Sequence, residues 1–326
     1  MILEGIVIVG FALLLDFLIG DPKTKYHPTA WIGKLIAVLV PFSRNNSPKK
    51  ELFGGILIVF VVVTIVSTLL VALDFGISLL TIDVISLVVS IVVGSILLKT
   101  TIAIRGMQKH ALSVVDALEK DDLDSARNHL SMIVKRNTKH LDKNHISSAV
   151  LESVSENTVD GITGPLFYYA IFGLPGAFVY RAINTIDSMV GYKTSLFRNI
   201  GWFGANCDTI LNYIPSRLTG LVMILSALIL GYNWKESFYI MRRDGKKLES
   251  PNAGFPIAAL AGALGTKLEK INYYAVGDGN IEFTKSHIIS AIRLMKVSSI
   301  LFCGLVTVPI ISALSFFRMV VTCLKK

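Results

Sequence analysis

The sequence contains uncharged apolar segments that are long enough to cross a lipid bilayer. Leu52–Leu73 and Val297–Phe317 carry no charged residue, and each reaches the roughly 20 residues that an α-helix needs to span the hydrocarbon core. Ile2–Gly20 and Phe75–Leu98 are nearly as apolar and are interrupted only by acidic residues. Because a segment in lipid must satisfy its backbone hydrogen bonds internally, these four segments predict transmembrane helices.

Three further uncharged segments are short or are interrupted by glycine and proline, namely Gly161–Tyr180, Leu218–Trp234 and Ser250–Thr266. Such segments suit re-entrant or cavity-lining helices as well as full spans. The distribution of Lys and Arg over the loops permits six spans and mildly favours four. We therefore expect an all-α integral membrane protein with about four full transmembrane helices plus short or re-entrant helices.

The apolar pattern stops between residues 99 and 160. Met107, Ala111 and Val115 fall at helical spacing there, next to polar positions. This pattern predicts a cytosol-facing helical insert at 99–160 within a single polytopic membrane domain that covers residues 1–326. We find no alternating strand pattern of useful length.

The composition separates this chain from soluble classes of protein. Hydrophobic residues make up 52% of the sequence and charged residues 17%, whereas soluble domains carry about 25% charged residues. The net charge of +9 arises from basic residues spread over membrane-flanking loops, which favours contact with anionic lipid over nucleic acid. The three cysteines show no CxxC spacing, which argues against a zinc site or a disulfide framework.

Ionisable residues inside apolar segments are costly and therefore mark candidate functional positions. The first cluster contains Asp16, Asp21 and His27, where the first helix ends. Gly20 and Pro22 explain the end of the helix, and Asp21 could simply cap the next turn. Asp16 lies one turn inside the helix, where a carboxylate needs a cation, an amine or a metal.

The second cluster is acidic. Glu152, Glu156 and Asp160 are four residues apart and therefore share one helical face. A solvated amphipathic face tolerates this spacing, but a site for Mg²⁺ or an ammonium group would use it, because hard cations take oxygen ligands. We expect these three carboxylates to bind metal or an amine.

The third cluster lies in Tyr180–Lys193. Residues 181, 184, 187 and 188 share one face of a helix, and a tyrosine and a lysine follow it. An Arg–Asp pair that joins two helices would explain part of this pattern, but the density of polar groups favours a substrate-contacting face. The candidate residues are Arg181, Asn184, Asp187, Ser188, Tyr192 and Lys193.

The fourth cluster combines Asp208 and Asn212 with Arg217, and Pro215 is expected to end the turn and leave Arg217 free. An arginine suits carboxylate or phosphate through its fork of donors, although it could equally anchor the next apolar helix at the membrane interface. Further along, the loop around Asn252 offers backbone N–H groups as a phosphate cradle.

Common catalytic motifs do not occur in this sequence: it has no P-loop, no GxSxG elbow, no HExxH pair and no EF-hand loop. The polar clusters, in the order described, resemble the CobD/CbiB family of cobalamin biosynthesis membrane proteins. The resemblance extends from Leu13–Gly33 to Ser250–Gly254 and on to the loop Tyr273–Gly279. Its most specific stretches are Glu152–Gly161, Tyr180–Tyr192 and Leu211–Arg217.

The resemblance implies an adenosylcobinamide-phosphate synthase, which is an acid–amine ligase. Such an enzyme joins the f propionate carboxylate of (adenosyl)cobyric acid, its corrinoid substrate, to the amine of (R)-1-aminopropan-2-ol or its O-phosphate. A carboxylate and an amine do not condense readily in water. The acid must therefore be activated, and this chemistry points to ATP and Mg²⁺.

The resemblance and this chemistry assign expected roles to the clusters. The expected metal or ammonium ligands are Glu152, Glu156 and Asp160. The expected general base is Asp187, or Asp21 with His27. The expected substrate-binding residues are Arg181, Asn184, Ser188, Tyr192, Lys193, Asp208, Asn212, Arg217 and Asn252, with the two arginines holding a phosphate or a corrin carboxylate.

Two other functions remain open at this point. A corrinoid permease would also place polar residues on broken helices, although the helical insert and the lack of a clear repeat count against it. A non-catalytic membrane scaffold for corrinoid enzymes would tolerate replacement of the acidic residues. We expect a multi-pass protein of the cell membrane, with membrane lipid as a partner, no nucleic acid, and the active-site loops facing the cytoplasm.

Overall fold

The computed structural model describes residues 2–22 and 24–324, apart from the side chains of Arg318 and Leu324. The described part is almost entirely helical and contains one short hairpin. The chain divides into two compact units, and each is described by itself. Unit 1 comprises residues 1–103, 164–211 and 303–326, and unit 2 comprises residues 104–163 and 212–302.

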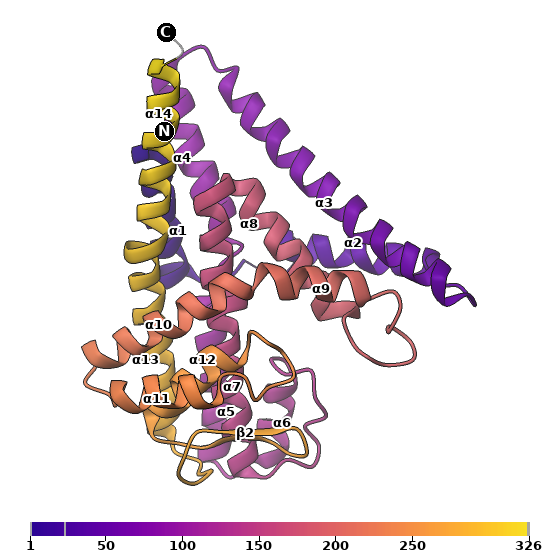
Figure 1. Cartoon of the computed structure of the whole chain (residues 1–326), viewed down its shortest axis with the longest axis vertical. Coiled ribbons are helices and arrows are strands. Elements are labelled where there is room, and N and C mark those ends of the chain that lie inside the picture. Colours follow the sequence, from indigo (N-terminus) through magenta and orange to yellow (C-terminus); the bar gives the residue numbers. More distant parts are fainter. Residues whose placement is uncertain (1, 23, 325–326) are drawn as a thin grey trace. The chain divides into compact units, whose positions relative to one another are not determined.

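Unit 1 consists of long apolar helices (Figure 1). They are α1 (Ile2–Ile19), α2 (Pro28–Phe42), α3 (Pro48–Ser78), α4 (Asp83–Lys99), α8 (Gly164–Val190), α9 (Trp202–Leu211) and α14 (Val308–Leu324), with a 3₁₀ turn at Thr24–Tyr26 and a π turn at Cys303–Thr307. α1 packs along α4 and α14, whereas α3 packs against α2, α8 and α9. The sequence sets these elements because each consists of an apolar run bounded by polar or helix-breaking residues.

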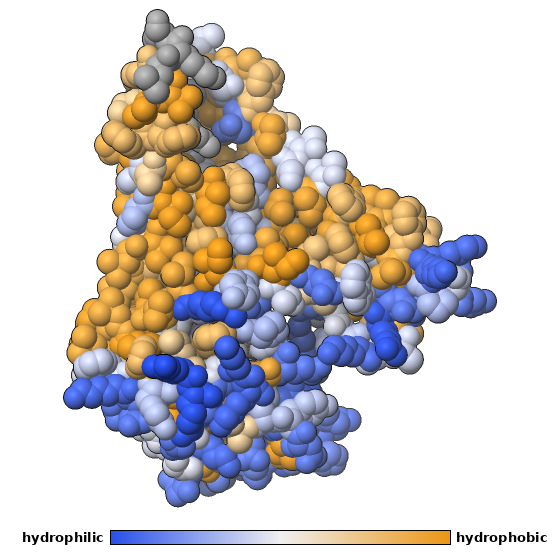
Figure 2. All heavy atoms as spheres, viewed as in Figure 1, coloured by the Kyte–Doolittle hydropathy of each residue, from blue (hydrophilic) through white to orange (hydrophobic). Residues whose placement is uncertain are grey.

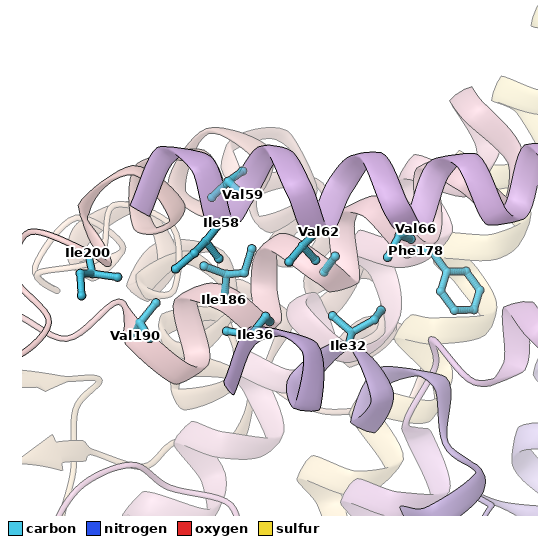
Figure 3. Close-up of a cluster of buried hydrophobic side chains, with 11 residues drawn as sticks. Ile32, Ile36, Ile58, Val59, Val62, Val66, Phe178, Ile186, Val190 and Ile200 are labelled. Atoms are coloured by element: carbon cyan, nitrogen blue, oxygen red, sulfur yellow. The ribbon is translucent and has the colours of Figure 1, made fainter. Parts of the chain in front are cut away.

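A cluster of branched apolar side chains joins α2, α3 and α8 (Figure 3). Ile58, Val62 and Val66 follow one another at four-residue spacing on α3, and they face Ile36 of α2 and Ile186 of α8. The opposite side of α3 exposes further large apolar side chains. In water such a face would be unfavourable, so its solvent is the hydrocarbon core of a membrane.

Five helices in the described residues are long and apolar enough to cross a membrane, or six if α9 and the next helix count as one bent span. The protein is therefore an all-α, multi-pass membrane protein, as the apolar segments predicted. One boundary differs, because α3 continues to Ser78 and the following helix begins at Asp83 rather than at Phe75. Asp74 is exposed and does not interrupt α3, whereas the acidic Asp83 lies in the first turn of α4, where the helix dipole favours it.

The interrupted segment Gly161–Tyr180 lies mostly in α8, which bends in its middle. Gly173 has a positive φ of 69°, and Pro175 follows it inside the helix. A glycine adopts this left-handed backbone conformation without steric penalty, and a proline removes a helical hydrogen bond, so the pair explains the kink.

Unit 2 combines amphipathic helices with a buried one. Its elements are α5 (Ile104–Glu119), α6 (Leu123–Ser131), α7 (Lys143–Thr158), a π turn (Val159–Thr163), α10 (Tyr213–Ile229), α11 (Trp234–Asp244), α12 (Gly254–Leu264), β1 (Leu268–Lys270), β2 (Tyr274–Val276) and α13 (Lys285–Phe302). The antiparallel hairpin pairs Leu268 with Val276 and was not expected, because its strands are only three residues long.

The helical insert predicted at 99–160 forms α5, α6 and α7, and these helices pack within unit 2 rather than alone. α7 packs against α12 and α13. The segment Ser250–Thr266 supplies α12, whose small residues are almost all buried. At Gly262 a side chain would overlap with the Glu236 carbonyl oxygen of α11, so the absence of a Cβ allows the two backbones to approach closely. In unit 2, polar side chains dominate the visible surface of α5, α6 and the hairpin (Figure 2).

Candidate functional site

The first predicted cluster centres on a buried ion pair in unit 1. The Asp16 side chain has no exposed surface, and its Oδ1 lies 3.9 Å from Nζ of Lys99. Lys99 ends α4, and its ammonium also donates to the Gly20 carbonyl oxygen. Gly20 has a left-handed φ of 73° that ends α1 and turns this carbonyl toward the lysine. The predicted need of Asp16 for a cation is confirmed, and Lys99 is a residue that the sequence analysis missed.

Asp21 and His27 come together beside the same lysine. Asp21 Oδ1 lies 3.5 Å from Lys99 Nζ and 3.7 Å from His27 Nε2. The Thr29 amide donates to His27 Nδ1 at the start of α2, so Nε2 carries the proton of the neutral imidazole and points at the carboxylate. Burial raises the pKa of Asp21, but the His27 hydrogen bond and the Lys99 charge outweigh it and hold this pKa below its ordinary value.

A hydrogen-bond relay joins α8 to α9 in unit 1. Arg181 Nη1 donates to Asn184 Oδ1 at 3.2 Å, and Asn184 Nδ2 donates to Asp208 Oδ1 at 3.2 Å. Asn184 is buried, while the other two side chains are partly exposed. The first bond connects residues i and i+3 on the predicted polar face of α8. The relay fixes the amide between a cation and an anion, and it brings together three of the predicted substrate-binding residues.

Asp187 lies one turn beyond the relay, near the end of α8. Its Oδ1 occupies the space that a Cβ at position 191 would need, and Gly191 leaves that space open. Gly201 likewise lets its backbone approach the Val190 carbonyl oxygen. Gly191 thus leaves room for the partly exposed Asp187 carboxylate at the end of the helix. Ser188 is also partly exposed.

Tyr192 and Lys193 follow directly after α8. The ring of Tyr192 lies 6.3 Å from the ring of Phe197, in a tilted arrangement, and Lys193 is exposed. Both residues therefore lie in the connection that leads from α8 to α9.

Arg217 and Asn252 meet in unit 2. Arg217 Nη1 donates to Asn252 Oδ1 at 3.2 Å and to the Tyr213 carbonyl oxygen at 2.7 Å, and Nη2 donates to the Pro251 carbonyl oxygen at 3.5 Å. The guanidinium also lies 3.5 Å from the ring centroid of Tyr213 and 4.4 Å from that of Phe255. Within the described part of the chain, these bonds use three of the five N–H donors of a rigidly held arginine.

One expectation about this region was wrong. Pro215 does not end a turn but lies in the first turn of α10, where its missing N–H costs no helical bond. Arg217 is consequently helical and held by its neighbours. In the loop that was expected to cradle phosphate, the amides of Asn252 and Ala253 donate to Ser250 Oγ. Phosphate binding by this loop stays a prediction.

Asn212 is buried and separates α9 from α10. Its carbonyl oxygen accepts the Ser216 amide at 3.1 Å, as expected of the residue before a helix. Because Asn212 lies at a helix boundary, Asp208 on α9 and Asn212 four residues later do not lie on one continuous helix.

The acidic cluster of unit 2 is partly neutralised. Glu152 Oε2 accepts a hydrogen bond from Arg136 Nη2 at 3.1 Å, and the Tyr274 hydroxyl of β2 also donates to it. Burial, followed by the negative charge of Glu152, raises the pKa of Tyr274 well above its ordinary value. Glu156 is exposed on α7, whereas Asp160 lies in the π turn, so the helical register changes before the third carboxylate.

Among the described residues, no group of three or more His, Cys, Asp or Glu side chains is close enough together to hold a metal ion. The predicted metal role of Glu152, Glu156 and Asp160 stays a prediction.

Asp244 is a further buried acid that the sequence analysis did not single out, because it lies inside a basic run. It is fully buried, Arg243 holds it through two hydrogen bonds of 2.7 and 2.8 Å, and Lys247 Nζ lies 2.7 Å away. The Gly277 amide donates to it at 3.0 Å. Despite burial, which raises the pKa of Asp244, these bonds hold that pKa well below its usual range. Asp244 thereby fixes the loop after β2.

The predicted residues are thus divided between the two units. Unit 1 brings together Asp21 with His27, and Arg181 with Asn184 and Asp208. Unit 2 brings together Arg217 with Asn252. Chemically, these groups offer a carboxylate beside a lysine, a polar relay and an arginine fork, which can bind charged substrates.

Comparison with known proteins gives matches over most of the chain. A family model described as CobD/Cbib protein matches residues 9–295. The chain is 41% identical over 300 residues to "Probable cobalamin biosynthesis protein CobD" of Methanothermobacter thermautotrophicus, covering 92% of this chain and 96% of the relative. It is 40% identical over 305 residues to "Cobalamin biosynthesis protein CobD" of Leptospira interrogans, covering 90% of this chain and 94% of the relative. No solved structure matches the chain.

Proposed function

Because this chain belongs to the CobD/CbiB family, we propose that it is the cobalamin-biosynthesis enzyme that converts (adenosyl)cobyric acid to cobinamide or cobinamide phosphate. Membership in the family makes it a protein of cobalamin biosynthesis. The proposed step joins the f propionate carboxylate to the amine of (R)-1-aminopropan-2-ol or its O-phosphate.

The reaction forms a C–N bond and removes one oxygen from the carboxylate. In the proposed form, that oxygen leaves with a phosphate derived from ATP, so that ATP becomes ADP and phosphate. The ammonium nitrogen loses two protons: the general base accepts one before the nitrogen attacks, and the second leaves with the phosphate as the amide forms. The product is an amide. The protein must therefore bind an anion, hold an ammonium group and accept a proton.

The observation that carries the proposal is the fixed guanidinium of Arg217. Two aromatic rings and three oxygen acceptors hold it, and it is only partly buried. An arginine held in this way loses little freedom when it pairs with a carboxylate or phosphate, which favours two parallel hydrogen bonds. Arg181, held by Asn184, offers a second cation in unit 1.

Proton acceptance is assigned to Asp187. Asp21 was the alternative, but its lowered pKa makes its carboxylate a weak base, and His27 directs its Nε2–H toward Asp21. The pair Asp21 and His27 is better suited to holding the ammonium of the aminoalcohol than to removing its proton. Asp187 is partly exposed and lies at the end of α8.

In this proposal, Mg²⁺ binds together with the nucleotide. Because the described carboxylates do not form a metal cluster, the phosphates of ATP would bring most of the ligands, and Glu156 or Asp160 would add one. The metal would stabilise the negative charge on the phosphate that leaves. We further propose that the polar loops face the cytoplasm of the cell membrane, where ATP is present.

A single assay tests the proposal. Purified protein in detergent is incubated with adenosylcobyric acid, aminopropanol phosphate, ATP and Mg²⁺, and mass spectrometry follows the product. We expect the mass of adenosylcobinamide phosphate, together with ADP in equal amount, only when all components are present.

Other outcomes assign other functions. Transport of corrinoid into vesicles without formation of the amide would identify a permease. Folded protein that binds corrinoid yet forms no amide, unless soluble corrinoid enzymes are added, would identify a scaffold. Either result would overturn the proposed reaction.

A further inference from the structure

A pocket of about 270 Å³ lies in unit 1 where α2 turns into α3. Its lining combines apolar residues, which include Phe42, Phe53 and Leu57 and are called its apolar side, with polar residues, which include Arg44, Asn45 and Lys50 and are called its polar side. None of these residues belongs to the clusters described above. The pocket therefore needs an explanation of its own.

The pocket lies at the point where a membrane span begins. Charged residues end at Glu51 on α3, and the helix then continues without charge to Leu73. Such a transition marks the boundary between lipid headgroups and hydrocarbon. Figure 2 shows polar side chains at the tip where α2 meets α3, beside the apolar surface of α3.

The polar side of the pocket is positively charged. Arg44 and Lys50 line it, and Lys49 adds a third positive charge next to them in the sequence. The nearby acid, Glu51, accepts hydrogen bonds from Asn199 Nδ2 at 3.0 Å and from the Asn45 amide at 3.5 Å. The lining thus carries an excess of positive charge.

The frame of the pocket is tightly packed. Ser43 Oγ can donate to the carbonyl oxygens of Leu39 and Gly54, at 3.3 and 3.4 Å, and a Cβ at Gly54 would overlap with the Ser43 side chain. The guanidinium of Arg44 lies 5.2 Å from the ring centroid of Phe197. α2 and α3 therefore meet closely, and the Phe197 ring lies against the arginine that lines the pocket.

The apolar side is open rather than covered. Phe42 is 83% exposed and Phe53 is 67% exposed, and Leu57 continues the same surface one turn further along α3. A free phosphate in water would make no use of these side chains. A phospholipid would use both sides, since its phosphate needs cations and its acyl chains need an apolar face.

We propose that this pocket is a binding site for one anionic phospholipid. Its phosphate lies between Arg44 and Lys50, and its acyl chains follow Phe53 and Leu57 along α3. The volume is slightly below the roughly 300 Å³ of small-molecule pockets, which suits a headgroup whose chains remain outside. This proposal is independent of the reaction proposed above.

Native mass spectrometry of the detergent-solubilised full chain tests this site. Equal amounts of phosphatidylglycerol and phosphatidylcholine are titrated, and the bound lipid is counted for each. The test variant is Arg44→Gln/Lys50→Gln. The matched control is Lys25→Gln/Lys34→Gln, which removes the same charge from exposed lysines near α2. The melting temperatures of both variants are compared with that of the wild type to verify that the variants fold.

We expect wild type and the control to bind one phosphatidylglycerol in preference to phosphatidylcholine, and the test variant to lose roughly 10- to 30-fold in affinity. Leu57→Trp, which keeps every charge but fills the apolar side, should also weaken phosphatidylglycerol binding. If the test and control variants lost the same affinity for phosphatidylglycerol, the effect would come from the total charge of the protein and not from this pocket. That result would overturn the proposed site. Displacement of the lipid by an equal concentration of inorganic phosphate would overturn the choice of a lipid.

Discussion

Lys99 Nζ lies 3.9 Å from Asp16 Oδ1, and the Asp16 side chain is fully buried in unit 1. Lys99 ends α4, Asp16 lies one turn before the end of α1, and the two helices pack along each other. Removing one member of a buried ion pair leaves the other charge without compensation, which is more unfavourable than replacing both. This relationship leads to the first prediction.

Lys99→Met should lower the free energy of unfolding by about 3 kcal/mol, because it leaves a buried carboxylate without its cation. Thermal unfolding in detergent measures the effect. Lys34→Met, at an exposed position of α2, serves as the control and should change little. The double variant Asp16→Asn/Lys99→Met should recover part of the loss. If the single and double variants were equally unstable, the pair would not be the cause.

Arg217→Lys should raise the KM for the anionic substrate about tenfold, since lysine keeps the charge but cannot supply a fork of donors. Arg217→Gln should raise it further. Steady-state kinetics of amide formation measure both. Arg242→Lys, the same exchange at an exposed position of α11, should leave KM unchanged. If Arg217→Lys had the same KM as the wild type, Arg217 would not bind the anionic substrate.

Asp187→Asn should lower the rate of amide formation by roughly 100-fold or more, because general base catalysis contributes about that factor. The amount of protein in the membrane should stay the same, as measured by immunoblotting. Asp74→Asn is the control, since Asp74 is an exposed acid on α3. Full activity of Asp187→Asn would show that another group accepts the proton.

Asp244 makes the loop after β2 sensitive to acid. Its pKa is lowered in the folded protein, so its contribution to stability is complete above the unfolded pKa of about 3.9 and is lost as the pH falls through the lower folded pKa. Below about pH 4, hydrogen–deuterium exchange of the Gly277 amide should accelerate in the wild type relative to neutral pH, after correction for the intrinsic exchange rate.

In Asp244→Asn the same amide should exchange faster already at neutral pH and should respond less to acid, because the ion pairs with Arg243 and Lys247 are gone. Asp116→Asn, at an exposed position of α5, should behave like the wild type. A Gly277 amide that exchanges identically in the Asp244 variant and the wild type would contradict this assignment.

Two glycines of α3 should respond in opposite directions to alanine. A Cβ at Gly55 would overlap with the Ile200 carbonyl oxygen, so Gly55→Ala should lower the free energy of unfolding by about 2 kcal/mol. At Gly76 nothing lies within 4 Å, so Gly76→Ala should raise it by about 0.5 kcal/mol through helix propensity. Denaturation in detergent compares the pair, and equal changes would show that the contact with residue 200 does not form.

Much of the architecture follows from the sequence, because helices depend on neighbours a few residues apart. The uncharged run Leu52–Leu73 predicts a membrane helix, and the period of Met107, Ala111 and Val115 predicts the buried face of α5. The polar face shared by Arg181 and Asn184 was likewise predictable, and the structure joins them by a hydrogen bond. Their spacing alone places such side chains together.

Only the tertiary structure decided which distant residues meet. The sequence indicates that Asp16 needs a cation, but the packing of α1 on α4 selects Lys99. Likewise, Arg217 finds Asn252, 35 residues away, because α10 packs against α12. Helical periodicity repeats every 3.6 residues and therefore encodes local faces, whereas the pairing of faces depends on side-chain packing across the whole unit.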